Sequence, residues 1–164
     1  MNISTGFGMT LLIVGTMAGS ATAQEAAHRS RCKAIHAAMA EDLTTACKPD
    51  DDSCFIGEVA GNHGLRGTTY FRADGSGTSP DTSPDFVPYS GQFEYSTKRG
   101  TLIMRETGIV NQTQGNLDSG AVTAFQKIVD ATGDWAGTTG YFFVNGFSRE
   151  GHVQTRVSGE ICRP

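Results

Sequence analysis

The sequence has few charged and few aromatic side chains. Of its 164 residues, 18% are charged and 9% are aromatic, and the net charge of −4 comes without a long run of Lys and Arg. A disordered acidic tail needs a higher charge density, and a helical bundle is richer in Ala, Leu, Glu and Lys. A nucleic-acid-binding domain needs a basic patch, so no nucleic-acid partner is expected. The length allows one domain.

The familiar catalytic and metal-binding motifs are also missing. The chain contains no G-x-S-x-G, no H-E-x-x-H and no phosphate-binding loop. No two cysteines have the C-x-x-C spacing of many zinc sites. The acidic run at 50–52 lacks the alternating carboxylates of a calcium loop, so a solvated turn is expected there. We therefore expect no metal site and no cofactor.

Residues 1–23 contain no charged side chain at all. They hold an apolar stretch at 9–17, which is shorter than the roughly 20 residues that span a bilayer. Residues 21–23 form an A-x-A site for cleavage before Gln24. The segment predicts a signal peptide, although its first residues lack the usual Lys or Arg. The mature protein is then expected to be secreted or periplasmic, with no membrane association after cleavage.

Residues 25–46 are rich in alanine and contain neither Gly nor Pro. Ile35, Met39 and Leu43 recur at i, i+4 and i+8, which places them on one face of a helix. A Lys-Pro dipeptide and the acidic run end this pattern. Residues 24–53 are therefore predicted to form a helical segment and a linker.

From Cys54 onward, apolar and polar residues alternate with the period of two that is typical of strands. Short turns rich in Gly, Asn and Ser separate the alternating runs, which indicates antiparallel hairpins, and a longer polar gap at 74–86 predicts a loop. Such a series usually closes into a barrel, because closure removes the exposed edges. We predict an all-β fold: a closed antiparallel up-and-down β-barrel of seven or eight strands over residues 54–164, preceded by the short helix. The predicted strands are Phe55–Gly61, Leu65–Ala73, Val87–Thr97, Thr101–Val110, Ala121–Ala131, Thr138–Phe147 and His152–Cys162.

The four cysteines are an even number, which in an exported protein predicts two disulfides. In a barrel of even strand number the first and last strands pair. Cys54 at the start of the first predicted strand is therefore expected to bond to Cys162 at the end of the last. That leaves Cys32 with Cys47, which a straight helix would hold about 22 Å apart, beyond the reach of a disulfide. The alternative, Cys47–Cys54 with Cys32–Cys162, therefore stays open.

The segment at 129–141, VDATGDWAGTTGY, is the most distinctive stretch of the chain. Gly133, Gly137 and Gly140 suit a tight turn with positive φ and close backbone approach. Trp135 has the bulk to plug one end of a barrel. The segment therefore predicts a turn that closes a barrel end.

The same segment resembles the G-G-T-G-x-F-x-G-A-x-G signature of the allene oxide cyclase and dirigent barrels. Ala131, Trp135 and Thr138 depart from it, since they replace a glycine, a phenylalanine and an alanine of the signature. The resemblance extends, less sharply, from Cys54 to Cys162. It implies a barrel that binds a small apolar molecule, and in the cyclases a carboxylate and a held water act inside an apolar cavity. It also allows a homo-oligomer, because members of these families associate as dimers or trimers.

Five residues are candidates for ligand binding. Arg105 and Glu106 are neighbours on one predicted strand and point to opposite faces, so one of them faces the barrel interior if the strand is regular. A charged group inside a barrel needs a partner, which makes this pair a ligand-binding candidate; a β-bulge or a polar barrel mouth is the alternative. Tyr141, Phe143 and Asn145 share one face of their strand and would line an aromatic cavity, unless they belong to a filled core.

These observations lead to two hypotheses for function. In the first, the barrel binds a small apolar molecule, with or without cyclase or isomerase chemistry. In the second, a filled barrel is a structural or interaction module whose loops contact a protein or a glycan. Glycine is frequent within the predicted strands and would leave room inside the barrel, which favours the first hypothesis. These glycines are Gly57, Gly61, Gly67, Gly91 and Gly108.

Overall fold

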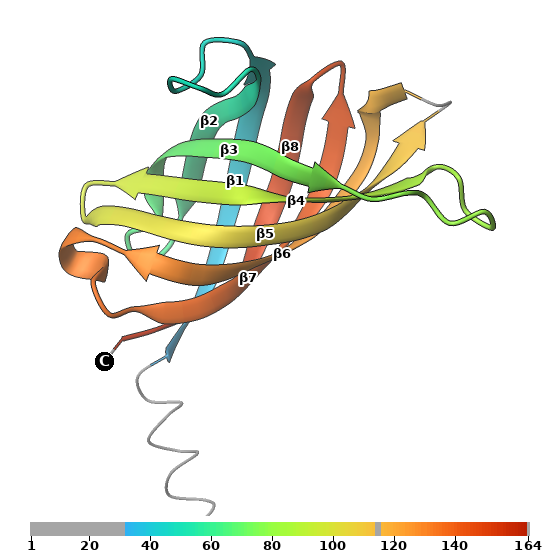
Figure 1. Cartoon of the computed structure of the whole chain (residues 1–164). Helices are drawn as coiled ribbons and strands as arrows, with labels where there is room; N and C mark the ends of the chain where they lie inside the picture. The colour runs from blue at the N-terminus through green and yellow to red at the C-terminus, as the bar shows by residue number, and fades with distance from the viewer. Residues whose placement is uncertain (1–31, 114–115, 164) are drawn as a thin grey trace, which may run out of the picture.

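The computed structural model describes residues 32–113 and 116–163; the predicted signal peptide lies outside them. Eight antiparallel strands follow one another in chain order and close into a barrel, in which β1 is hydrogen-bonded to both β2 and β8 (Figure 1). The predicted all-β, closed, up-and-down barrel is therefore confirmed, with eight strands. Their bounds are β1 (Cys32–Thr44), β2 (Cys54–Gly61), β3 (Arg66–Ser76), β4 (Phe86–Thr97), β5 (Gly100–Thr113), β6 (Asn116–Ala131), β7 (Thr139–Arg149) and β8 (His152–Cys162), and a 3₁₀ turn, η1 (Gly133–Trp135), joins β6 to β7.

β1 takes the place of the predicted helix. The prediction of a helix over 25–46 is wrong for all of β1, while residues 25–31 lie outside the described part of the chain. Positions four apart share a face in a strand as well as in a helix, so the spacing of Ile35 and Met39 fits both. Both side chains are buried inside the barrel. Pairing with β2 and β8 outweighs the helix propensity of the alanines. The barrel thus begins with β1. Of the predicted helical segment and linker at 24–53, only the loop at 45–53 connects β1 to β2.

The additional strand also decides the disulfide pairing. β1 lies between β2 and β8, and Cys32 is directly opposite Cys162 in the β1–β8 register. These two cysteines are bonded, with Cα atoms 3.9 Å apart, and Cys47 is bonded to Cys54. The favoured pairing of Cys54 with Cys162 and of Cys32 with Cys47 is therefore wrong, and the alternative is confirmed. The first and last strands do meet, but the first strand is β1, which the alanine-rich sequence conceals.

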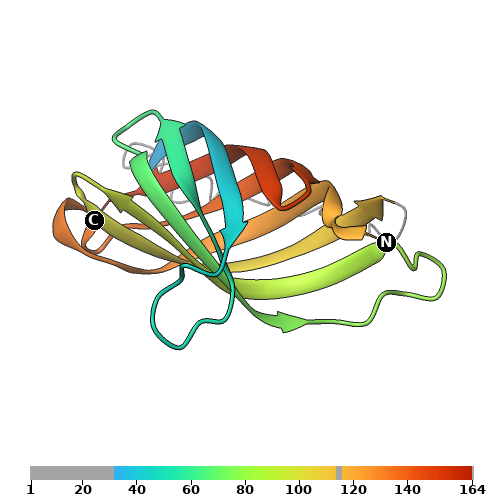
Figure 2. The same ribbon diagram turned by 90° about the horizontal axis from the view of Figure 1, so that it is seen from above.

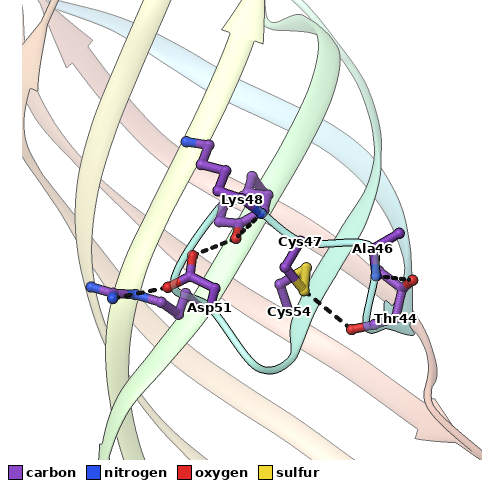
Figure 3. The surroundings of a disulfide bond; sticks show 8 residues. Thr44, Ala46, Cys47, Lys48, Asp51 and Cys54 are labelled. Atoms are coloured by element: carbon purple, nitrogen blue, oxygen red, sulfur yellow. Dashed lines mark hydrogen bonds and ion pairs between the residues drawn. A yellow bond between two sulfur atoms is a disulfide. The ribbon is translucent and has the colours of Figure 1, made fainter.

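The second disulfide holds a loop against the outer face of the barrel. The loop at 45–53 connects β1 to β2 and is closed by this disulfide (Figure 3). The Asp51 carboxylate accepts hydrogen bonds from Tyr70 Oη at 2.5 Å and from Arg72 at 3.0 Å, both on β3, and these bonds hold the pKa of Asp51 below its usual value. The ammonium group of Lys48 lies 4.5 Å from the centre of the Tyr70 ring. These contacts tie the loop to the outer face of β3.

Trp135 closes one end of the barrel. Its side chain is 1% exposed, and its Nε1 donates a hydrogen bond to Thr97 Oγ1 at 2.9 Å. The guanidinium of Arg99 lies 4.6 Å from the indole ring. Gly133 has a φ of 61°, and a Cβ at this position would lie 2.5 Å from the carbonyl oxygen of Arg99, so the turn needs glycine. The predicted plug and its tight turn are confirmed.

The inward-facing side chains divide the barrel into two regions. The region next to η1 is apolar and closely packed. The opposite end carries the β1–β2 and β3–β4 loops, and the β3–β4 hairpin extends well beyond the barrel (Figures 1 and 2). The half toward those loops contains most of the buried polar side chains, together with apolar ones such as Phe71, Val122 and Ala124. The apolar region contains Ile35, Leu65, Leu102, Trp135, Phe142 and Ile161, each at most 3% exposed.

The strand glycines do not leave open space inside the barrel. A Cβ on Gly57 would lie 1.9 Å from a carbonyl oxygen of β1. At Gly91 and Gly108, ring atoms of Phe71 and Tyr89 lie 2.4 Å and 2.5 Å from the position that a Cβ would take. Neighbouring backbone and aromatic rings thus occupy the space that the missing side chains leave. The glycines by themselves therefore give no support for a cavity.

Candidate functional site

Buried polar side chains gather on the inward faces of the strands, toward the end opposite Trp135. Two of them are carboxyl groups. An unpartnered buried charge is strongly destabilising, so such a group must be paired, protonated or tied to a function. We therefore take this cluster as the candidate site. It consists of Glu41, Thr69, Glu106, Gln126, Ser148 and Thr155, each at most 6% exposed.

Glu106 on β5 is held by two donors. Its Oε1 accepts a hydrogen bond from Tyr89 Oη at 2.8 Å, and its Oε2 accepts one from Gln126 Nε2. The side-chain oxygen of Gln126 accepts a further hydrogen bond from Tyr95 Oη at 2.6 Å. Tyr89 is half-buried and lies on β4 two positions closer to the β3–β4 loop than Gly91, the residue opposite Glu106. The hydrogen bonds thus fix Glu106 from two sides.

Glu41 on β1 has fewer partners. Its Oε1 accepts a hydrogen bond from Thr69 Oγ1 on β3 at 2.7 Å. Gly57 of β2 is opposite both residues in the register, so the Glu41 side chain reaches across a position with no side chain. Thr155 on β8 is a diagonal neighbour of Glu41, and its buried Oγ1 has no hydrogen-bond partner among the described residues. Hydrogen-bonding capacity is therefore unused next to Glu41.

Burial changes the acidity of both carboxyl groups. Desolvation raises the pKa of Glu41 from 4.5 to about 7; the hydrogen bond from Thr69 opposes this rise, and the negative charge of Glu106 adds to it. Desolvation also raises the pKa of Glu106, against the hydrogen bonds from Gln126 and Tyr89. Glu41 therefore exchanges a proton near neutral pH, where an acid–base group is most effective.

The raised pKa of Glu41 predicts a stability that falls as the pH rises. Between the unfolded value of 4.5 and the folded value of about 7, the folded protein binds a proton that the unfolded chain has lost. The contribution of Glu41 to stability is therefore fully present below pH 4.5, and it is lost as the pH rises to about 7. We expect the free energy of unfolding to decrease by about 3 kcal/mol over this range. Urea unfolding at several pH values measures it.

The matched variants for this prediction are Glu41→Gln and Glu150→Gln. The first removes the titrating group, so we expect it to reduce the slope between these pH values by at least half, with the remainder due to Glu106. Glu150 is exposed in the β7–β8 turn, and its variant should keep the full slope. An unchanged slope in Glu41→Gln would contradict the assignment.

Arg105 and Glu106 lie on opposite faces of β5, as the sequence predicts. Glu106 faces inward, while Arg105 is exposed and donates to the Asp74 carboxylate and, at 3.2 Å, to Ser90 Oγ. The pairing of β5 with β4 is regular at both positions, so the alternative of a bulge does not hold there. The prediction that one of the two residues is interior is confirmed, and that residue is Glu106.

Tyr141, Phe143 and Asn145 lie on the outer face of β7. Phe143 is 48% exposed, whereas its neighbour Phe142 is fully buried in the core. The prediction that these three residues line an internal cavity is therefore wrong. Because β7 carries aromatic residues on both faces, alternation alone does not show which face is inside. Phe143 instead packs with Tyr141 and Phe125 in a cluster on the outside, with ring centres 5.5 Å from that of Phe143.

Sequence reasoning missed most of the interior cluster. Glu41 lies in the segment that was expected to be helical, where its inward position is hidden. Once that segment is treated as a strand, Glu41 has the same parity as Ile35 and Met39, which places it inside. Gln126 and Tyr89 lie in strands that alternation predicts. They could have been identified as polar residues inside the barrel only if it were known which face of each strand points inward.

Other kinds of site find little support in the part of the chain that the structure describes. There, the one group of residues close enough to hold a metal ion is Cys32, Cys162 and Glu160, and both sulfur atoms are used in the disulfide. The same part contains no helix with the length and apolar character required to cross a membrane.

Comparison with known proteins does not assign the site. No protein-family model matches the chain, and no curated protein is significantly similar to it. The assignment of a function therefore depends on the chemistry of the barrel interior.

Proposed function

We propose that the barrel binds a small, mostly apolar molecule whose polar group reaches Glu41 and Glu106. The observation that carries this proposal is the burial of two carboxyl groups in one barrel interior. Folding does not require them, because well-packed apolar residues of similar size are at least as stabilising in such places. A buried carboxyl group with a pKa near neutrality is typical of acid–base sites.

Tyr89 provides the entrance to this site. Its ring covers Gly108, and its hydroxyl group donates to Glu106. Burial raises the pKa of Tyr89, so the hydroxyl group stays protonated and remains a donor. When the ring turns toward the mouth, it frees the space over Gly108 and one oxygen of Glu106. A hydroxyl group of the ligand then takes the place of the Tyr89 hydroxyl, while the unused Oγ1 of Thr155 offers a second contact.

The two carboxyl groups also support an isomerase or cyclase reaction. The Glu41 carboxylate takes a proton from one atom of the bound molecule, and the acid so formed returns it to another atom, so that bonds rearrange without an oxidant or a cofactor. The resemblance of the segment at 129–141 to the allene oxide cyclase and dirigent barrels supports the same function, as does the closed eight-stranded architecture. The predicted signal peptide and the two disulfides support secretion or a periplasmic location.

The test begins with native mass spectrometry of the mature protein from the exported fraction of its own host, where we expect a co-purifying small molecule. Ligand-free protein is then titrated with N-phenyl-1-naphthylamine, a neutral dye that fluoresces in apolar sites. Tyr89→Phe removes the hydrogen bond to Glu106, so we expect dye entry to be about tenfold faster. Tyr70→Phe, on the outer face of β3, is the matched control and should not change the rate. No dye binding, or equal rates in both variants, would overturn the proposal.

A second function, that of a structural or interaction module, is favoured because aromatic rings occupy the space next to two strand glycines. If the rings of Phe71 and Tyr89 stay over Gly91 and Gly108, the barrel is a rigid module. Its most prominent feature is then the β3–β4 hairpin, which extends beyond the barrel (Figure 2). This function predicts no co-purifying small molecule and loss of a protein or glycan partner when the loop at 77–85 is shortened.

A further inference from the structure

A groove crosses the outer face of the barrel over β7, β8, β1 and β2. Its volume is about 650 Å³, within the range of small-molecule sites. Its exposed lining residues, among them Ala38, Glu58 and Arg156, face away from the barrel interior, whereas Met39, Val59 and Thr155 of the same lining are buried. The groove therefore lies on the other side of the barrel wall from Glu41 and Glu106, and Thr155 borders both. Three strand spacings separate β7 from β2, which makes the groove about 14 Å wide in that direction.

Three alanines form the floor of this groove. Ala38 and Ala40 lie on the outer face of β1, and Ala60 is opposite Ala38 on β2. All three are exposed. Because methyl groups are short, the larger side chains on β7, β8 and β2 stand above the floor on both sides. The groove is therefore shallow, open to solvent and apolar at its base.

Polar side chains stand on both sides of the alanine floor. Arg156 and Asn145 are opposite each other on β8 and β7, and Glu58 lies on β2 at the other side. All three are exposed, and none of the three side chains makes a hydrogen bond or an ion pair with another described residue. Together they offer a donor group, a carboxylate acceptor and an amide that does both. One positive and one negative charge leave the groove without net charge.

Phe147 adds an aromatic face at the β7 side of the groove. Its side chain is 45% exposed, although it is large and apolar. Aromatic rings bind the C–H faces of sugar rings, and exposed rings of this kind often mark binding surfaces. On the neighbouring strand β6, Phe125 is also exposed but does not line the groove.

We propose that this groove binds a neutral, β-linked oligosaccharide. Such a chain presents flat C–H faces to Phe147 and the alanine floor. Its hydroxyl groups, each both donor and acceptor, fit the mixed set of Arg156, Asn145 and Glu58. The balanced charges do not favour a phosphate or an acidic peptide. A closed barrel also has no free edge to which a peptide could add as a strand.

The test is isothermal titration of the mature protein with cellohexaose, laminarihexaose and chitohexaose, with hexagalacturonate as the charged comparison. We expect at least one of the neutral chains to bind and the charged one to bind more weakly. Arg156→Ala and Phe147→Ala should each weaken binding about tenfold. Phe125→Ala is the matched control for an exposed ring outside the groove and should leave binding unchanged.

Ala40→Trp fills the groove from its floor and should abolish binding of the oligosaccharide. Its thermal unfolding and its uptake of N-phenyl-1-naphthylamine are measured in parallel, to show that the barrel is intact. The proposal is overturned if none of the three neutral chains binds, or if Ala40→Trp still binds with full affinity. It is also overturned if sedimentation shows self-association that Ala40→Trp removes, since the groove is then an interface between copies of the chain.

Discussion

Replacing Cys32 and Cys162 together by alanine is expected to lower the free energy of unfolding by about 4–5 kcal/mol. Their disulfide joins residues 130 positions apart and connects the first strand to the last at the closure of the barrel. Without it, the unfolded chain gains the conformational freedom of nearly the whole domain. Since small domains are stable by about 5–15 kcal/mol, this loss is a large part of the total. Urea unfolding under non-reducing conditions measures it.

The control for this prediction is the other disulfide. Cys47 and Cys54 are 7 positions apart, so replacing both by alanine removes a much shorter cross-link and should lower the free energy of unfolding by about 2 kcal/mol. The difference between the two double variants is the informative quantity. Equal losses would show that the loop-closure argument does not apply to this barrel.

Trp135→Ala is expected to destabilise the protein by about 3–5 kcal/mol. The indole is almost fully buried at the barrel end, and its removal leaves a cavity among the surrounding apolar side chains. It also leaves Thr97 without the indole donor. Trp135 is the one tryptophan of the chain, so unfolding is best followed by circular dichroism rather than by fluorescence.

Trp135→Phe separates packing from hydrogen bonding at this position. Phenylalanine retains much of the apolar volume but has no donor, so we expect a loss clearly smaller than that of the alanine variant and above the roughly 1 kcal/mol of a single hydrogen bond. If the phenylalanine and alanine variants are equally unstable, the plug acts through its hydrogen bond and not through its bulk.

Much of the fold could be predicted from the alternation of residues along the chain. The strand at His152–Cys162 has the predicted bounds, and the six predicted strands before it each coincide with an observed strand within a few residues. Alternation is a local property, because each strand buries one face and exposes the other. β1 could not be found in this way, since alanine fits either face and the spacing of Ile35 and Met39 suits a helix equally well.

One part of the candidate site could be predicted from the sequence. Adjacent charged residues on a strand must face opposite sides, and this argument correctly places Arg105 or Glu106 inside. It does not extend to Glu41, whose strand was not recognised. It also fails on β7, where Phe142 and Phe143 make both faces aromatic and the wrong face was assigned to the interior.

The sequence by itself determined the class of fold, the antiparallel order of seven strands and the glycine-rich turn that carries Trp135, because these depend on the residues next to one another in the chain. The tertiary structure alone decided that β1 completes the barrel, that Cys32 meets Cys162, and that two carboxyl groups share one interior. Each of these depends on which strands become neighbours when the barrel closes. Closure joins residues far apart in the chain, and periodicity within a strand holds no information about that pairing.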